Sequence, residues 1–216
     1  MSSVLPYAGY LKGYGPFPVL YDGKGMPLFA HWKFPRHLPP SMIVLHYTGG
    51  GTFDANAIYL TKPNSREVSI HFLVGRNGEI ALLCPFTYIA YHAGKWSINR
   101  KAVGIECVGK GDSYTKAQMD ALVLLCARLC ELFSIPPGLI VGHRDIVPTI
   151  CPRGMSVWSV RQRVIALLGI EGDSSISGAK ARKRPSQPPL SASSRLLRLL
   201  DGRIRKGTAS VLHVDT

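Results

Sequence analysis

The hydrophobic positions of this chain fall into short continuous runs and longer runs with helical spacing. Short apolar runs bounded by turn residues predict buried strands, because both faces of such a strand are covered. These runs occupy residues 41–46, 69–74, 79–83, 102–108 and 139–141. The glycine-rich turn at residues 75–78 predicts that the second and third strands pair as a hairpin.

Two further runs have the spacing of amphipathic helices. The first begins at Thr115, which forms a capping-box pattern with Gln118, and it stops at the Pro-Pro-Gly sequence of residues 136–138. Its apolar residues recur at helical spacing: Met119, Leu122, Val123, Cys126, Cys130 and Phe133. Residues 157–168 predict a closing helix. Strands mixed with helices indicate a single α/β domain.

The composition changes on both sides of this domain. Residues 1–40 are rich in Gly, Pro and aromatic residues, and Tyr21-Asp22-Gly23 suggests a hairpin or an ordered arm. Residues 171–194 are dominated by Ser, Gly, Pro, Lys and Arg, which is typical of a flexible linker. We therefore expect an N-terminal arm over 1–40, the domain over 41–170, and a flexible basic tail over 171–216.

Charge narrows the possible partners only in part. The chain holds 26 Lys and Arg against 13 Asp and Glu, a formal net charge of +13. Nucleic acid, an anionic membrane and a bacterial envelope would all suit this excess. The basic run at 180–184 has no aromatic recognition motif beside it, so we do not expect nucleic acid as the partner.

Other features of the sequence argue against three classes of protein. The apolar runs are too short for a transmembrane helix, and residues 1–10 lack the basic and apolar pattern of a secretory signal. The cysteines are five in number, which does not suit a disulfide framework. Cys126 and Cys130 lie one helical turn apart, and we interpret them as buried thiols.

Three side chains at or beside strand ends have the chemistry of zinc ligands. They are His46, His143 and Cys151. Imidazole nitrogen and thiolate sulfur together suit zinc, and three protein ligands leave a fourth position open, as catalytic zinc requires. Spacing alone is weak evidence, because a histidine at a strand end is more often a polar residue with a structural partner.

Five sequence blocks in one order resemble the zinc-dependent N-acetylmuramoyl-L-alanine amidase family. That family includes phage amidase endolysins, muropeptide-recycling amidases and animal peptidoglycan recognition proteins. The resemblance covers about residues 40–168 and implies a central mixed β-sheet flanked by helices, with zinc at the floor of a groove. The blocks are IVLHYTGG (43–50), VSIHFLVGRNGEI (68–80), AYHAG (90–94), VGIE (103–106) and GHRDIVPTICP (142–152).

The resemblance implies roles for the metal ligands. His46 and His143 match the two histidine ligands of the family, and Cys151 matches the third. The third ligand is Cys in phage enzymes and active recognition proteins, and Asp in some recycling amidases. Recognition proteins that bind without cutting often have Ser there. The thiol at 151 therefore favours an active hydrolase over a binding module.

The resemblance also implies catalytic and substrate-binding residues. Ile70 stands where many members carry a catalytic tyrosine, so the proton shuttle is expected at Glu106. Thr149 stands where others have Lys, and its hydroxyl is expected to donate to the oxyanion. His92 is expected in the substrate groove, and His71 either in the groove or in support of a neighbour.

Two more residues stay open between a functional and an ordinary role. Asp145 either orients a metal ligand through a hydrogen bond or caps its own loop as an Asx turn. Trp96 either stacks on sugar or packs in the core.

The implied activity is hydrolysis of the amide bond between N-acetylmuramic acid and L-alanine in peptidoglycan. The basic tail favours a lytic, endolysin-type enzyme; the alternatives are a cytosolic recycling amidase and a non-catalytic peptidoglycan-binding module. Residues 194–206 alternate apolar and basic positions. Such a segment either binds anionic envelope lipids or is a solvated tail that only raises solubility. We expect synthesis in the cytoplasm and action at the cell wall or periplasm after release.

Overall fold

A five-stranded mixed sheet forms the centre of the domain. The computed structural model describes residues 5–6, 20–21, 29–31 and 33–170. The strand order is β6 (Ile80–Leu82), β5 (Phe72–Val74), β8 (Ala102–Cys107), β4 (Met42–Tyr47) and β9 (Ile140–Gly142). β4 runs parallel to β8 and β9, and β5 runs parallel to β8, whereas β5 and β6 are antiparallel. The expected mixed sheet with flanking helices is confirmed.

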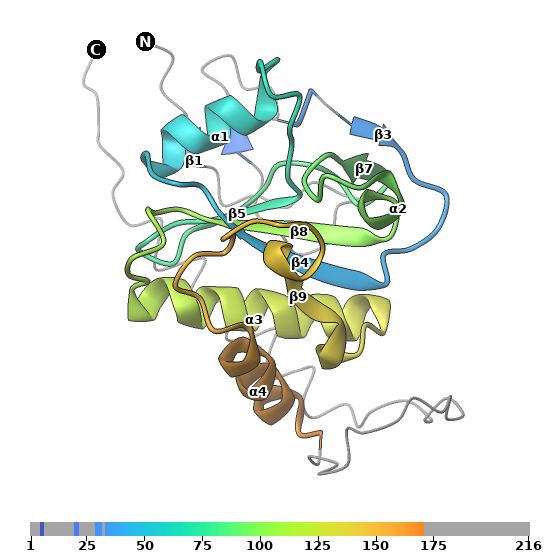
Figure 1. Cartoon of the computed structure of the whole chain (residues 1–216), viewed down its shortest axis with the longest axis vertical. Coiled ribbons are helices and arrows are strands. Elements are labelled where there is room, and N and C mark those ends of the chain that lie inside the picture. Colours follow the sequence, from blue (N-terminus) through green and yellow to red (C-terminus); the bar gives the residue numbers. More distant parts are fainter. Residues whose placement is uncertain (1–4, 7–19, 22–28, 32, 171–216) are drawn as a thin grey trace, which may run out of the picture.

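Helices cover both faces of this sheet. In Figure 1, α3 (Lys116–Phe133) and α4 (Val157–Leu168) lie on one side and α1 (Phe53–Thr61) on the other. The side chains of β5 alternate accordingly, because successive strand residues point to opposite faces. Phe72 and Val74 join the core beneath α3, whereas Leu73 joins a smaller core with Ala57 and Leu60 of α1.

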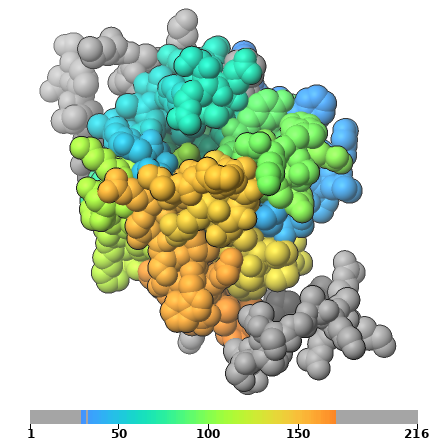
Figure 2. All heavy atoms as spheres, viewed as in Figure 1, coloured from blue at the N-terminus to red at the C-terminus, as the bar shows by residue number. Residues whose placement is uncertain are grey.

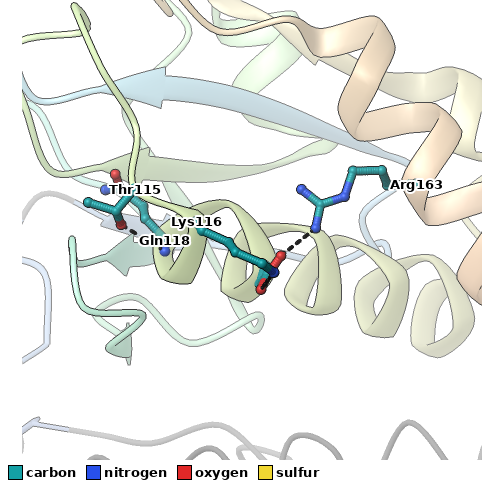
Figure 3. Close-up of polar contacts among 5 residues, drawn as sticks. Thr115, Lys116, Gln118 and Arg163 are labelled. Atoms are coloured by element: carbon teal, nitrogen blue, oxygen red, sulfur yellow. Dashed lines mark hydrogen bonds and ion pairs between the residues drawn. The ribbon is translucent and has the colours of Figure 1, made fainter.

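The capping box predicted at the start of α3 requires two hydrogen bonds, and the structure shows one of them. The Thr115 hydroxyl oxygen accepts from the Gln118 backbone N–H at 3.1 Å, which caps the helix (Figure 3). The Gln118 side chain does not return to Thr115 as a capping box requires. Its amide instead donates to the carbonyls of Val74 and Val108, at 3.1 and 2.9 Å. Gln118 therefore ties the helix to the ends of β5 and β8.

This cap gives a stability prediction. Thr115→Ala should lower the free energy of unfolding by about 1 kcal/mol, because the first turn of α3 loses its side-chain acceptor. Urea unfolding followed by circular dichroism would measure the change. Lys116→Ala is the control, since its ion pair with Asp120 lies at the surface and should contribute little. Equal losses in the two variants would contradict the capping role.

An ion pair joins the two helices on the α3 side. The Arg163 guanidinium of α4 lies 2.6 Å from a carboxylate oxygen of Asp120 in α3, and Lys116 binds the other oxygen at 2.7 Å (Figure 3). The closing helix is thereby held beside α3, and its bounds agree with the predicted residues 157–168.

A small second layer lies beside the sheet and was not predicted. β3 (Lys33–Pro35) pairs antiparallel with β7 (Tyr88–Ala90), and the short α2 (Trp96–Asn99) follows. Arg36 holds this layer together. Its guanidinium donates to the carbonyls of Tyr88, Arg100 and Ala102 at 3.2, 2.8 and 2.8 Å. Residues 33–36, expected in the arm, are therefore packed on the domain.

The remaining elements are short. β1 (Leu5–Pro6) pairs antiparallel with β2 (Leu20–Tyr21), and the single-turn helices η1 (Pro137–Leu139) and η2 (His143–Asp145) flank β9. The predicted turn at Asp22-Gly23 and the tail over 171–216 lie outside the described residues. Among the residues that are described, no helix has the length and apolar character needed to cross a membrane.

Candidate metal centre

The fold brings the three predicted ligands together. His46 lies near the end of β4, His143 begins η2 directly after β9, and Cys151 follows on the next loop. Because β4 and β9 are parallel neighbours, their carboxyl ends meet at one edge of the sheet. One ligand atom from each residue lies within 4.8 Å of the other two.

The arrangement of these atoms fits a zinc ion. Cys151 Sγ lies 3.7 Å from His46 Nδ1. Tetrahedral zinc with bonds of about 2.3 Å to sulfur and about 2.0 Å to nitrogen holds such a pair about 3.5 Å apart. His143 Nε2 is buried and has no hydrogen-bond partner, although such a nitrogen normally finds one. A metal ligand role accounts for both observations.

Burial also sets the protonation of the three ligands. It lowers the pKa of His46 well below the ordinary value, and His92 and His143 add to that effect. Burial lowers the pKa of His143 as well. Both rings are therefore neutral, which is the form that binds metal. Burial raises the pKa of Cys151 to about 12, so metal binding has to displace the thiol proton.

A cavity of about 300 Å³ opens over these residues. Figure 2 shows the surface hollowed between the cyan-to-teal segment of α1 and the orange loop that carries Cys151. Glu106 and Thr149 line the cavity together with the three ligands, so the structure brings together all five residues predicted for metal and catalysis. Glu106 is the register partner of His46 across the parallel pair β8–β4, which places it beside the ligand.

Glu106 has the environment of a proton carrier. One of its oxygens is buried without a hydrogen-bond partner. Desolvation raises the pKa of the carboxyl to about 8, and the positive charge of Arg66 works against that rise. A bound dication would lower the pKa further. Because these effects oppose one another, the pKa of Glu106 stays close to neutral pH, where a general base is most effective.

The remaining predicted residues on the ligand loop have defined partners. The Thr149 hydroxyl oxygen accepts from the Cys151 N–H at 3.3 Å, which leaves its own proton to donate. A carboxylate oxygen of Asp145 accepts from the Gly142 N–H at 2.8 Å. Asp145 therefore caps its own loop, which was the second of its two predicted roles.

The two histidines predicted to bind substrate lie in different places. His92 lines the cavity, and its Nδ1 is 3.0 Å from Nε2 of His46. His71 is fully buried and is not among the cavity-lining residues. Its Nδ1 accepts from the Gly104 N–H at 3.1 Å, and its Nε2 faces the Tyr88 carbonyl at 3.3 Å. The position of His71 suits the predicted supporting role and not the groove.

Arg66 also lines the cavity, and the sequence analysis did not single it out. It lies on the loop between α1 and β5. That loop is folded around Asn64, whose side chain binds both the N–H and the C=O of Val68, at 3.1 and 2.9 Å. Trp96 is 46% exposed and packs edge-on against Phe34 and Tyr91, so it is not a core residue.

Comparison with known proteins agrees with this site. A sequence profile described as N-acetylmuramoyl-L-alanine amidase matches residues 36–154, which include every residue of the metal centre. The chain belongs to this amidase family. The amidase AmiD of Escherichia coli (strain K12) is 28% identical over 159 residues, covering 57% of this chain and 56% of AmiD. The chain thus spans little more than half the length of that relative.

Further relatives share the amidase fold. The 1,6-anhydro-N-acetylmuramyl-L-alanine amidase AmpD of Enterobacter cloacae is 28% identical over 152 residues, covering 60% of this chain and 81% of AmpD. Among solved structures, an AmpD has a TM-score of 0.53 at 25% identity and covers 63% of this chain and 91% of its own. An endolysin from Bacillus subtilis has a TM-score of 0.56 at 26% identity, with 64% and 94% covered.

Proposed function

We propose that this chain is a zinc-dependent amidase that hydrolyses the bond between N-acetylmuramic acid and L-alanine in peptidoglycan. The observation that carries the proposal is the cavity shared by His46, His143, Cys151 and Glu106, whose Oε2 has no hydrogen-bond partner, in a chain of the amidase family. The test is incubation with purified sacculi and mass analysis of the products. New L-alanine amino ends support the proposal, and new reducing sugar ends alone would refute it.

The residues of the cavity divide the chemistry of amide hydrolysis between them. His46, His143 and Cys151 would hold the zinc, which supplies Lewis acidity toward the carbonyl and toward water. Glu106 takes a proton from the attacking water as its oxygen bonds to the carbonyl carbon. The Thr149 hydroxyl donates to the oxygen that gains charge. Glu106 then gives the proton to the L-alanine nitrogen as the C–N bond breaks.

Arg66 gives a prediction about the pH profile. Its charge lowers the pKa of Glu106, so Arg66→Gln should raise that pKa. Glu106 acts as a base when ionised, and the ascending limb of kcat/KM should therefore move to higher pH. The shift should be less than about one pH unit, because Arg66 is exposed and solvent screens its charge. A limb that stays in place in low-salt buffer would refute the coupling.

The matched control for this experiment is Lys62→Gln. Lys62 is an exposed cation close to Arg66 in sequence, but it does not line the cavity. Its removal changes the net charge by the same amount, so it reports any general electrostatic effect. The pH limb of this variant should coincide with that of the unmodified enzyme.

We propose a lytic role at the cell wall or periplasm, with recycling as the alternative. The net charge of +13 supports attraction to an anionic envelope, which would supply lipid contacts for the basic tail as well as substrate. The similarity to AmpD, named as a 1,6-anhydro-N-acetylmuramyl-L-alanine amidase, supports recycling. Rates on intact sacculi and on soluble anhydro-muropeptide separate the two. A strong preference for the soluble substrate would refute the lytic role.

A further inference from the structure

We propose that His92, held in place by Asn99, supports His46 so that the two histidine ligands bind metal through opposite ring nitrogens. The inference rests on the proposed zinc site and adds how this chain orients its ligands. His46 would bind through Nδ1 and His143 through Nε2. His92 and Asn99 are then positioning residues, since they act through His46.

The orientation of His46 is fixed from two sides. Its Nδ1 faces Cys151 Sγ at 3.7 Å, and its Nε2 lies 3.0 Å from His92 Nδ1. A neutral imidazole carries one proton, so a ring that binds metal through Nδ1 carries it on Nε2. That N–H donates to His92 Nδ1. Metal-bound histidines usually donate their second ring N–H to such a partner.

His143 presents the opposite ring nitrogen. Its Nε2 is buried without a hydrogen-bond partner. A buried ring nitrogen normally has such a partner, so a metal ion would satisfy it. A neutral ring that binds metal through Nε2 carries its proton on Nδ1.

The supporting segment is itself held rigidly. Asn99 in α2 is 7% exposed, and its side-chain oxygen accepts from the N–H groups of His92 and Ala93 at 3.2 and 2.8 Å. The His92 ring lies against β8 at Gly104, where an added Cβ would come within 2.7 Å of the ring. Asn99 and Gly104 therefore both restrict the position of this segment.

This arrangement leaves one hydrogen-bond donor, on the His92 ring, without a partner. Because His92 Nδ1 accepts from His46, the neutral His92 ring carries its proton on Nε2. That nitrogen is buried and has no partner, on a residue that lines the cavity. An unpaired buried donor is costly, so a substrate oxygen that accepts from it would gain affinity. His92 thus uses Nδ1 to support His46 and Nε2 for the predicted substrate contact.

The direct test is long-range ¹H–¹⁵N NMR on the zinc-loaded full chain. We expect metal-bound Nδ1 and protonated Nε2 for His46, the reverse for His143, and protonated Nε2 for His92. Binding of both ligands through the same nitrogen type would overturn the proposal. The spectrum needs no substrate, so an inactive chain with these tautomers would refute the proposed function and leave the orientation intact.

A variant series tests whether the support affects metal affinity. His92→Phe keeps a planar ring but removes the acceptor, and zinc affinity should fall about 10–100-fold. His92→Gln offers a side-chain oxygen as acceptor and should restore part of the loss. His37→Phe, at an exposed position, is the control and should leave the affinity unchanged. Equal zinc affinity in His92→Phe and the unmodified chain would refute the positioning role.

Discussion

Glu106→Gln is expected to lower kcat by about 10²-fold or more while one equivalent of zinc stays bound. The amide has nearly the shape of the carboxyl, so the change removes the proton carrier without opening a cavity. The ligand atoms belong to other residues, and no described hydrogen bond joins one of them to Glu106. Turnover on soluble muropeptide and zinc content of the same preparation would measure the two effects separately.

Two further variants serve as comparisons for Glu106→Gln. Glu131→Gln removes a carboxylate on α3 that pairs with Arg128, far in the fold from the cavity lining, and should leave kcat unchanged. Thr149→Val should cost less than Glu106→Gln, since it removes one neutral donor. If Thr149→Val were the more damaging change, the assigned roles of the two residues would be wrong. Near-normal turnover in Glu106→Gln would point to a different base.

Cys151→Ser should abolish both zinc binding and turnover. The serine hydroxyl stays protonated near neutral pH and is a poor zinc ligand, whereas the thiol forms a strong Zn–S bond once ionised. The loss in zinc affinity should exceed the roughly 10–100-fold that removal of a supporting partner costs. Zinc content after dialysis, followed by competition with a chromophoric chelator, would give its size.

The matched control is a second buried thiol. Cys130 lies on α3, 4% exposed, and contributes to the core rather than to the site. Cys130→Ala should keep one equivalent of zinc at some cost in stability. Cys151→Asp should recover part of the metal affinity, because a carboxylate oxygen also binds zinc. Full zinc content and full activity in Cys151→Ser would remove Cys151 from the metal centre.

The central sheet and its two long helices were predictable because their signals are local. β4, β8, α3 and α4 each agree with a predicted run to within one or two residues, since these elements pack continuous apolar or helically spaced positions into one core. The strand predicted over 69–74 is shorter, and β5 covers only Phe72–Val74. Residues before it, such as His71, bond to other parts of the backbone instead.

Elements that form through contacts between residues far apart in the sequence were not predictable. α1 has buried residues at Ala57, Leu60 and Thr61, which do not form the broad apolar stripe that marks a helix in sequence. β3 and β7 pair across more than fifty residues, and Arg36 holds them through backbone carbonyls that carry no sequence signal.

The site was predictable as a set of residues but not as a network. The blocks of the amidase family identify His46, His143, Cys151 and Glu106 by type and order. The loop that presents Arg66 and the support that Asn99 gives to the 92–93 segment depend on hydrogen bonds to backbone groups. Neither has a motif that a single sequence would reveal.

The register of β4 against β8 places His46 and Glu106 on adjacent central strands of the sheet. Such strands exchange their amide hydrogens only in rare openings that approach global unfolding, whereas peripheral elements open locally at lower cost. α1 and the loop over 62–68, which form the outer wall of the cavity, contact the sheet less extensively. Hydrogen exchange should therefore be fast in that wall and slow at residues 45–46 and 105–106, which would let the wall open locally while the reactive groups keep their spacing.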